Sequence, residues 1–214
     1  MKVELRMENK GHISHLVIKR LPRYYRFLGE LINEGVKRIS SRELAERMGL
    51  TASQIRQDLN CFGGFGQQGY GYNVDQLYEE IGLILGLHKK EKAILVGVGN
   101  LGRAIANHVK FEQLGFQLIG IFDKNEALNG EIIRNIPVRN TSVMDEFCRE
   151  NHPSTAILCI PKDAAVVISE QLINLGVKGF WNFSHADIGV GHADVSVENM
   201  HFGDSLMTLR YKLN

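Results

Sequence analysis

Cysteine is scarce in this 214-residue chain and is never arranged as a metal-ligand or disulfide motif. The three cysteines, Cys61, Cys148 and Cys159, are odd in number and widely spaced, and none forms a Cys-x-x-Cys pair. This pattern argues against a disulfide scaffold and against a zinc ribbon, and it fits reduced thiols in the cytoplasm. We expect all three to be buried as small hydrophobic side chains.

Long apolar runs are also lacking. No run approaches the roughly 20 residues of a membrane span, and residues 1–12 alternate charge with single apolar residues, without the apolar core of a secretory signal. No internal repeat or low-complexity tract is present. The composition, 44% hydrophobic and 23% charged, is that of an ordinary globular protein with one large or two small domains. We expect a cytoplasmic protein with no membrane partner.

The net charge of +1 hides an asymmetry along the chain. Residues 1–73 hold 12 Lys and Arg against 7 Asp and Glu, whereas residues 74–214 hold 13 against 17. The front third is therefore the better candidate for a polyanionic partner. A mildly basic solvated surface would show the same balance.

Three helices are predicted in this front third. The first spans about 14–34, with apolar residues at helical spacing; Pro22 is expected to kink it or to start a second segment. The second, Ser41–Met48, and the third, ending at Asn60, are joined by a glycine turn. Capping boxes are predicted at both starts, from Ser40 with Glu43 and from Thr51 with Gln54. Two short capped helices joined in this way are typical of a helix-turn-helix.

The third helix has a polar face suited to DNA. Ile55 and Leu59 share the face that should join the core, and Asp58 lies nearer that inner face and should brace the fold. The outer face and its flanks present side chains that can bond base edges or phosphates: Ser53, Gln54, Arg56, Gln57 and Asn60. A capped helix that is merely solvated would also carry polar residues here.

A hairpin and a further helix follow. Glycines alternate with aromatics across Phe62–Tyr72, around Gln67 and Gln68, which predicts the β-hairpin of a winged helix. Residues 75–87 have the spacing of an amphipathic helix. The polar stretch 88–92 then predicts a domain boundary.

A dinucleotide-type glycine turn opens the second domain. The apolar strand Ala93–Val96 leads into Gly-x-Gly-x-x-Gly, followed by a helical pattern, and this context makes the short motif informative. The first glycine permits the tight turn, the second lets a pyrophosphate approach the backbone, and the third allows close helix–strand contact. Amides and the dipole at the helix start favour the anion. The residues concerned are Gly97, Val98, Gly99, Asn100, Leu101 and Gly102.

Strands and helices alternate after this turn. Strands are predicted at 116–122, 155–160 and 179–183, and helices at 143–150, 164–175 and 204–213. This rhythm predicts a parallel sheet with helices on both faces, and ligands bind such sheets at the carboxyl edge. Ile160 and Pro161 should lie at that edge.

Asp123 ends the second strand, 21 residues after Gly102. A carboxylate there would bond the adenosine ribose hydroxyls and repel a 2′-phosphate, which favours NAD(H) over NADP(H). The positive charge of the neighbouring Lys124 weakens that preference. We expect Lys124 to contact the cofactor as well. A surface aspartate that merely begins a turn is the alternative.

The histidines do not have the spacing of a metal motif. His185, His192 and His201 could be gathered as a catalytic base or as ligands, but their irregular spacing favours solvated or core-satisfied roles. We expect no metal and no catalytic residue.

Five motifs together resemble the Rex family of redox-sensing transcriptional repressors, and the resemblance covers nearly the whole chain. They are Lys19–Arg26, Gln54–Leu59, Gly69–Val74, Gly97–Gly102 and Trp181–Phe183. The resemblance implies an N-terminal winged-helix domain (1–88), a C-terminal Rossmann-like parallel-sheet domain (89–200) and a C-terminal helix (201–214) swapped within a homodimer. It also implies operator DNA binding when the protein is free or holds NAD⁺, and release by NADH. The expected DNA contacts are Arg20, Arg23, Ser53, Gln54, Arg56, Gln57, Asn60, Gln67, Gln68 and Tyr70.

The chain departs from the family at several positions. Gln67 and Gln68 stand where basic wing residues are common, and His185 stands where proline is frequent. His201 and His108 occupy the places of an Asp and a Tyr that would join Arg20 in an interdomain network. That coupling must use other chemistry here.

Oxidised and reduced nicotinamide differ in ring charge. A pocket formed by Ile160, Pro161 and Phe202 of the partner subunit would penalise the cationic ring by desolvation, so we expect tighter binding of NADH than of NAD⁺. Two other interpretations stay open. One is an NAD-dependent dehydrogenase with an N-terminal extension, and the other is a repressor whose ligand is coenzyme A.

Overall fold

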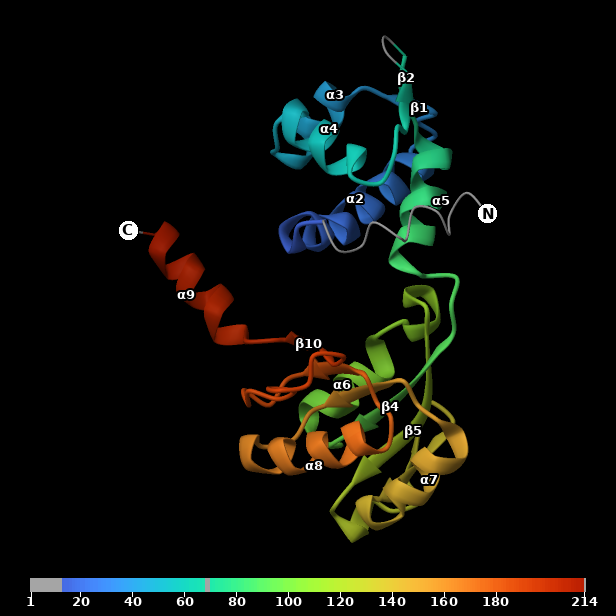
Figure 1. Cartoon of the computed structure of the whole chain (residues 1–214), viewed down its shortest axis with the longest axis vertical. Coiled ribbons are helices and arrows are strands. Elements are labelled where there is room, and N and C mark those ends of the chain that lie inside the picture. The colour runs from blue at the N-terminus through green and yellow to red at the C-terminus, as the bar shows by residue number, and fades with distance from the viewer. Residues whose placement is uncertain (1–12, 68–69, 214) are drawn as a thin grey trace. The chain divides into compact units, whose positions relative to one another are not determined.

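The computed structural model describes residues 13–67 and 70–213, and the chain divides into two compact units between His88 and Lys89 (Figure 1). Gln68 and residues 1–12, for which expectations are stated above, lie outside the described residues. No helix in the described ranges is long and apolar enough to cross a membrane.

The first unit is a winged helix. Its described helices and strands, in chain order, are α2 (His15–Asn33), β1 (Arg38–Ile39), α3 (Ser41–Met48), α4 (Ala52–Asn60), β2 (Gly66–Gln67), β3 (Gly71–Asn73) and α5 (Val74–Leu85). The strands form a small antiparallel sheet in the order β1-β3-β2. The predicted hairpin is thereby confirmed. The strand β1 was not predicted from the sequence, because a strand of two residues is too short to show an alternating pattern.

One apolar core holds the helices of this unit together. Leu21, Tyr24 and Leu28 on α2 are buried against side chains of the other helices, among them Leu44, Met48, Ile55, Leu59, Leu77 and Ile81. Ile55 and Leu59 are fully buried, as their shared helix face predicted.

The prediction that Pro22 starts a second helical segment is wrong, because α2 continues through Pro22 as one helix. A proline at this position removes the amide that would bond the carbonyl of Ile18. Ile18 lies on the exposed side of the helix, where water can hydrate that carbonyl. Leu21 and Tyr24, which flank the proline, are buried and hold the helix to the core.

The second unit is built on a seven-stranded sheet, as far as the structure describes it. The strands are β4 (Glu91–Val96), β5 (Phe116–Asp123), β6 (Ile132–Ile133), β7 (Ile136–Asn140), β8 (Thr155–Leu158), β9 (Gly179–Asn182) and β10 (Ser196–Asn199), in the order β10-β9-β8-β4-β5-β7-β6. Neighbouring strands pair in parallel except for the edge strand β6, which is antiparallel to β7. The chain reverses its direction across the sheet between β4 and β8, the switch point at which ligands bind in such folds.

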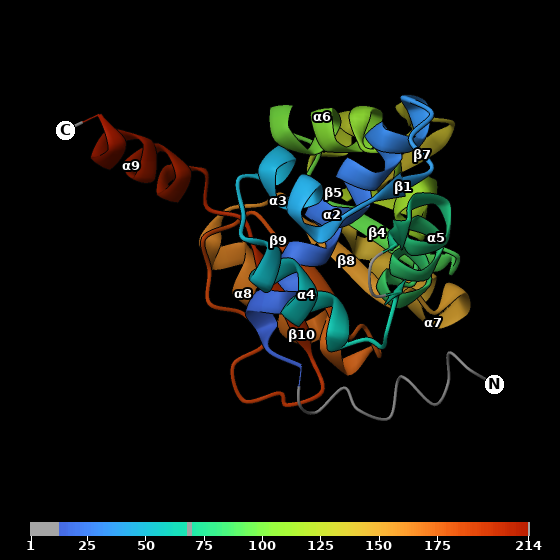
Figure 2. The same ribbon diagram turned by 90° about the horizontal axis from the view of Figure 1, so that it is seen from above.

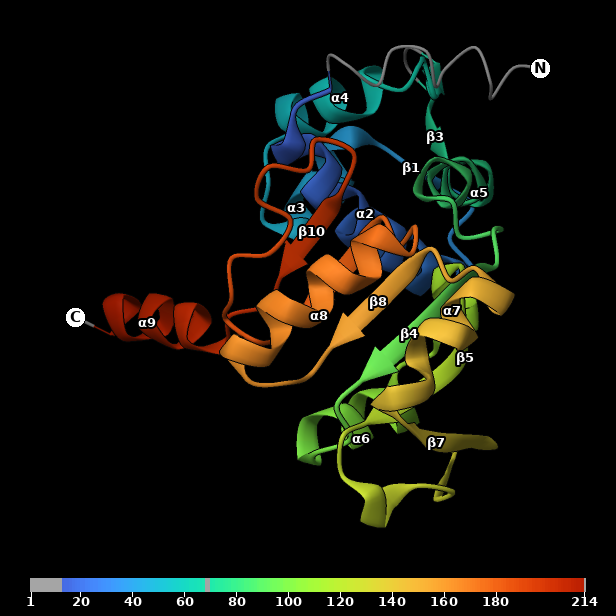
Figure 3. The same ribbon diagram turned by 60° about the horizontal axis from the view of Figure 1, so that its bottom comes forward.

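Helices cover both faces of this sheet, as the alternating pattern predicted. α6 (Asn100–His108) packs on one face with the short helix η2 (Phe111–Leu114). α7 (Met144–Asn151) and α8 (Lys162–Asn174) pack on the other and lie on the same side of the sheet in Figure 3. Short turns of 3-10 helix, η3 (Glu126–Leu128) and η4 (Thr141–Val143), fill the connections.

The last helix, α9 (Phe202–Lys212), buries none of its own residues. It follows β10 and extends away from the sheet of its own unit (Figures 1 and 2). Such exposure of a whole helix is unusual, because an isolated helix shorter than about 12 residues is marginally stable in water.

Candidate functional site

The glycine turn lies between β4 and α6, at the switch point of the sheet. Gly97 has φ +99°, and a Cβ on it would lie 2.4 Å from the carbonyl oxygen of Cys159. A Cβ on Gly102 would lie 1.9 Å from the carbonyl oxygen of Gly97, whereas one on Gly99 would meet nothing within 4 Å. Two glycines are therefore required by packing, and the third leaves open space over the turn.

The start of α6 faces this open space with uncapped amides. Gly99 is the N-cap, and no side chain among the described residues caps the helix. The first amides of a helix have no intrahelical partner, so those of Asn100, Leu101 and Gly102 can bond an anion. The amide of Val98 is already used, because it donates to Asp123 Oδ2 at 2.6 Å.

Asp123 braces the turn from the end of β5. Its Oδ2 accepts from Val98 and its Oδ1 accepts from the amide of Asn125 at 2.8 Å. Each carboxylate oxygen can accept more than one hydrogen bond, so the half-buried group can still accept from a ligand hydroxyl. The adjacent Lys124 is exposed.

Three further residues are predicted to contact the cofactor, and the structure places one of them, Ile160, directly beside the turn. Ile160 is so close that its Cγ2 would be 2.7 Å from a Cβ on Gly97, and Pro161 is the exposed N-cap of α8. In its own chain, the ring of Phe202 stacks on that of Phe183, with the ring centres 6.0 Å apart.

The exposed face of α4 presents the predicted polar side chains. Ser53, Arg56, Gln57 and Asn60 are exposed, while Gln54 is half-buried. Arg56 also links α4 to the helix before it, because its guanidinium donates to Ser41 Oγ at 2.9 Å.

The predicted capping box at the start of α4 is only half formed. Thr51 Oγ1 accepts from the amide of Gln54 at 3.1 Å, as expected. The Gln54 side chain does not return the bond, because its amide donates to Asp58 Oδ1 at 2.9 Å. The preceding box, between Ser40 and Glu43, is complete.

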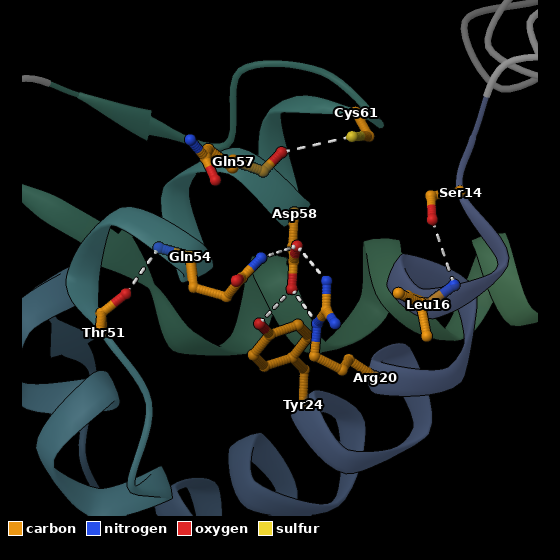
Figure 4. A network of polar contacts seen from close by, with 9 residues as sticks. All are labelled: Ser14, Leu16, Arg20, Tyr24, Thr51, Gln54, Gln57, Asp58 and Cys61. Carbon is orange, nitrogen blue, oxygen red and sulfur yellow. Dashed lines mark hydrogen bonds and ion pairs between the residues drawn. The ribbon is translucent and has the colours of Figure 1, made fainter.

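A polar network centred on Asp58 joins α4 to α2 (Figure 4). Arg20 donates to both carboxylate oxygens, at 2.6 Å from Nε and 2.8 Å from Nη2. The Tyr24 hydroxyl donates to Oδ2 at 2.6 Å, and Gln54 supplies the fourth bond. The carboxylate is 1% exposed, so the prediction that Asp58 braces the fold is confirmed.

In this network the side chains of Arg20 and Gln54 bind Asp58 and are not presented on the exposed face of α4. Burial alone would raise the pKa of Asp58, but the hydrogen bonds from Arg20, Tyr24 and Gln54 outweigh it and hold that pKa below its usual value. The carboxylate of Asp58 is therefore ionised at neutral pH and accepts hydrogen bonds from both Arg20 and Gln54. Arg23 is exposed but also has an internal partner, the carbonyl of Met48.

The wing carries a basic residue that the sequence did not single out. The Arg38 guanidinium lies 5.8 Å from the centre of the Tyr70 ring and donates to the Tyr70 carbonyl at 3.4 Å. Tyr70 itself is 69% exposed. Arg38 is on β1 and reaches the hairpin through the small sheet, a pairing that no local pattern indicates.

Comparisons with known proteins agree with this two-part architecture. The family model described as "Putative DNA-binding protein N-terminus" matches residues 12–60, and that described as "CoA binding domain" matches residues 88–186. The redox-sensing transcriptional repressor Rex of Caldanaerobacter subterraneus subsp. tengcongensis is 55% identical over 208 residues, 97% of this chain and 92% of the relative. The Clostridium botulinum protein of the same name is 50% identical, with 97% and 99% covered. The chain belongs to the Rex family of redox-sensing transcriptional repressors.

Solved Rex-family structures have the same fold. RSP, a Rex-family repressor, in complex with beta-NAD+ and operator DNA matches with a TM-score of 0.89 and 54% identity, covering 94% of this chain and 93% of RSP. RSP in complex with beta-NADH matches with a TM-score of 0.87 and 51% identity over 95% of each chain. The predicted fold, a DNA-binding winged helix followed by a Rossmann-like parallel-sheet domain, is confirmed.

The histidines of this Rex protein form pairs rather than one site. His185, which has φ +59°, and His201 are joined Nδ1 to Nδ1 at 2.7 Å, while His192 contacts Glu170 at 3.1 Å. His108 is exposed at the last position of α6. Across the described ranges, no three His, Cys, Asp or Glu side chains could hold a metal ion.

The cysteines of this Rex protein differ in burial. Cys148 is buried and Cys159 half-buried, and burial raises their pKa values to about 11 and about 12. The expectation of a buried thiol is wrong for Cys61, which is exposed. Cys61 ends α4 on its outer side, and its thiol donates to the carbonyl of Gln57.

Proposed function

We propose that this Rex protein represses transcription by binding operator DNA when its second domain is free or holds NAD⁺, and that NADH releases it. The observation that carries the proposal is the pairing of two surfaces in one chain. One is the exposed polar face of α4, and the other is the open glycine turn braced by Asp123. RSP in complex with beta-NAD+ and operator DNA is the relative that supports it.

The second domain would hold the cofactor by its pyrophosphate and adenosine ribose. The amides of Asn100, Leu101 and Gly102 suit the pyrophosphate, and the remaining acceptor capacity of Asp123 suits the ribose hydroxyls. Coenzyme A, which the name of the matching family model suggests, carries a phosphate on its adenosine ribose, which Asp123 would repel. We therefore favour NAD(H).

The nicotinamide end of the site would distinguish the oxidation states. Ile160 lies beside the turn and Pro161 follows it in the chain, and Phe202 of the partner subunit would complete an apolar wall if α9 is exchanged. An apolar wall costs the cationic ring its hydration, so NADH should bind more tightly than NAD⁺. We assign no catalytic residue, and we place this repressor with its operator in the cytoplasm.

The DNA half of the proposal predicts the effect of Arg56→Ala. Arg56 is an exposed cation on the predicted recognition helix, so its loss should weaken operator binding by about tenfold, the scale of one charge-assisted contact. NADH affinity should stay unchanged, because the substitution lies in the other compact unit. Anisotropy with a duplex selected from a random pool measures the first quantity, and calorimetry the second.

Arg149→Ala is the matched control, since Arg149 is 66% exposed on α7 in the second unit. It should leave operator binding at the wild-type level. An equal loss in both variants would show that the effect is general charge, and loss of NADH binding in Arg56→Ala would contradict the site assignment.

A homodimer formed through α9 is part of the proposal. Four apolar side chains, each more than half exposed, recur along this segment at spacings of four, three and four residues. They are Phe202, Leu206, Leu209 and Leu213. Such a stripe on a short helix needs a covering surface to be stable. A C2 dimer would also place two recognition helices about one DNA turn apart, roughly 34 Å.

Leu206→Glu is therefore expected to dissociate the dimer. A charge at the centre of the stripe should raise the dimer dissociation constant by about 100-fold, because burying an unpaired carboxylate is strongly unfavourable. Sedimentation equilibrium measures it. Ser205→Glu introduces the same charge on the polar side of α9 and should stay dimeric; a dimeric Leu206→Glu protein would refute the interface.

A further inference from the structure

An ion pair beside the glycine turn has no part in the function proposed so far. Arg103 follows Gly102 on α6, and its amide bonds the carbonyl of Gly99 at 3.0 Å. Both arms of its guanidinium bind Glu131, Nη1 to Oε1 and Nη2 to Oε2, the latter at 2.7 Å. A bidentate pair of this kind fixes the position of both side chains.

Asp123 lies within electrostatic reach of this pair. The hydrogen bonds to Glu131 raise the pKa of Arg103, and the negative charges of Glu131 and Asp123 raise it further. Asp123 is itself fixed, by the amides of Val98 and Asn125. Arg103, in the first turn of α6, therefore interacts with both carboxylates, and Asp123 marks the place where the adenosine ribose would lie.

The orientation of the Arg103 guanidinium decides whether a 2′-phosphate on the adenosine ribose could be bound. Arginine is the usual partner of a phosphate because its fork matches two phosphate oxygens. Here the fork is occupied by a carboxylate of the same geometry. A 2′-phosphate would have to compete with Glu131 for Arg103 while facing the charge of Asp123.

We propose that Glu131 is a specificity-determining residue of the nucleotide site, which excludes NADP(H) by holding Arg103 away from a 2′-phosphate. The sequence alone assigns this exclusion to Asp123. The structure adds Glu131, from the connection before β6, as the group that holds the guanidinium of Arg103. The inference rests on the proposed function, because it requires that the site bind NADH.

The test is calorimetric titration of the full-length wild-type protein and the Glu131→Gln variant with NADH and with NADPH. Glutamine fills the same space but cannot hold a guanidinium by charge, so Arg103 becomes available. NADPH should then bind about tenfold more tightly than it binds the wild type, the scale of one charge-assisted contact, while NADH affinity changes by less than about twofold.

Two more variants control this result. Glu131→Ala should show the same gain, which excludes an effect of the new amide. The double variant Arg103→Gln/Glu131→Gln should lose the gain, because the released guanidinium is gone. The inference would be overturned if the ratio of NADPH to NADH affinity stayed at the wild-type value in both single variants. It would also be overturned if the gain in NADPH affinity persisted in the double variant.

The wild-type titration distinguishes a failure of this inference from a failure of the proposed function. Absence of NADH binding by the wild type would refute the proposed function and this inference with it. Tight NADH binding by the wild type, with unchanged discrimination in Glu131→Gln, would refute this inference alone.

Discussion

Gly102→Ala is expected to lose NADH binding, with an affinity at least about 100-fold below that of the wild type. The new Cβ would lie 1.9 Å from the carbonyl oxygen of Gly97 and 3.0 Å from its carbonyl carbon, which are backbone atoms with no rotamer to change. The turn must therefore move away from the start of α6, and the amides that would hold a pyrophosphate move with it. The winged helix has its own core, so operator binding should persist and become insensitive to NADH.

Gly99→Ala distinguishes a ligand effect from a packing effect. A Cβ on Gly99 meets no protein atom within 4 Å, so thermal stability should equal that of the wild type. It would nevertheless fill the space that a pyrophosphate needs, so NADH affinity should fall. Calorimetry and thermal unfolding measure the two quantities. Wild-type NADH affinity in Gly99→Ala would show that the turn does not hold the nucleotide.

Asp58→Asn is expected to destabilise the winged helix by about 2 to 3 kcal/mol. The carboxylate accepts four hydrogen bonds, two of them from Arg20, and an asparagine oxygen cannot replace both oxygens. Removing one partner of a buried ion pair costs about 3 to 5 kcal/mol, and we take a lower value because Arg20 is 26% exposed. Operator affinity should fall as well, because the network sets how α4 lies on α2.

Asp75→Asn is the matched control, since Asp75 is 44% exposed and pairs with Lys37 on the surface. Its unfolding free energy, from urea denaturation of the full chain, should change by less than about 1 kcal/mol. If Asp58→Asn were no more destabilising than this control, the network would have no structural role.

The stabilisation by Asp58 should depend on pH in acid only. Its pKa in the folded protein lies below the ordinary value of 3.8, so the stabilisation is present above that value and is lost as pH falls through the lower folded value. The difference in unfolding free energy between the wild type and Asp58→Asn should therefore be constant from neutral pH to about pH 4 and shrink below it. A difference that disappears near pH 6 would point to another group.

Features set by neighbouring residues were predictable from the sequence. The capping box of Ser40 with Glu43 and the glycine turn are local, and the structure contains both. Apolar spacing likewise identified the buried side of α4, including the inward position of Asp58.

Features set by distant residues were not predictable in the same way. Gln54 matches a capping pattern, yet its side chain bonds Asp58, where Arg20 arrives from 38 residues away. The pairing of Arg103 with Glu131 spans 28 residues and has no sequence pattern. The short or polar strands β1, β6, β7 and β10 exist because neighbouring strands supply their hydrogen bonds, and their own residues show little periodicity.

NADH and operator DNA are expected to weaken each other's binding, and linkage requires this opposition to be reciprocal. The most direct measurement is a gel shift of a selected operator duplex with a constant amount of this Rex protein, titrated separately with NADH and NAD⁺. We predict that NADH dissociates the complex at concentrations at which NAD⁺ leaves it intact. Dissociation by both nucleotides at equal concentrations, or by neither when calorimetry shows NADH bound, would contradict the account.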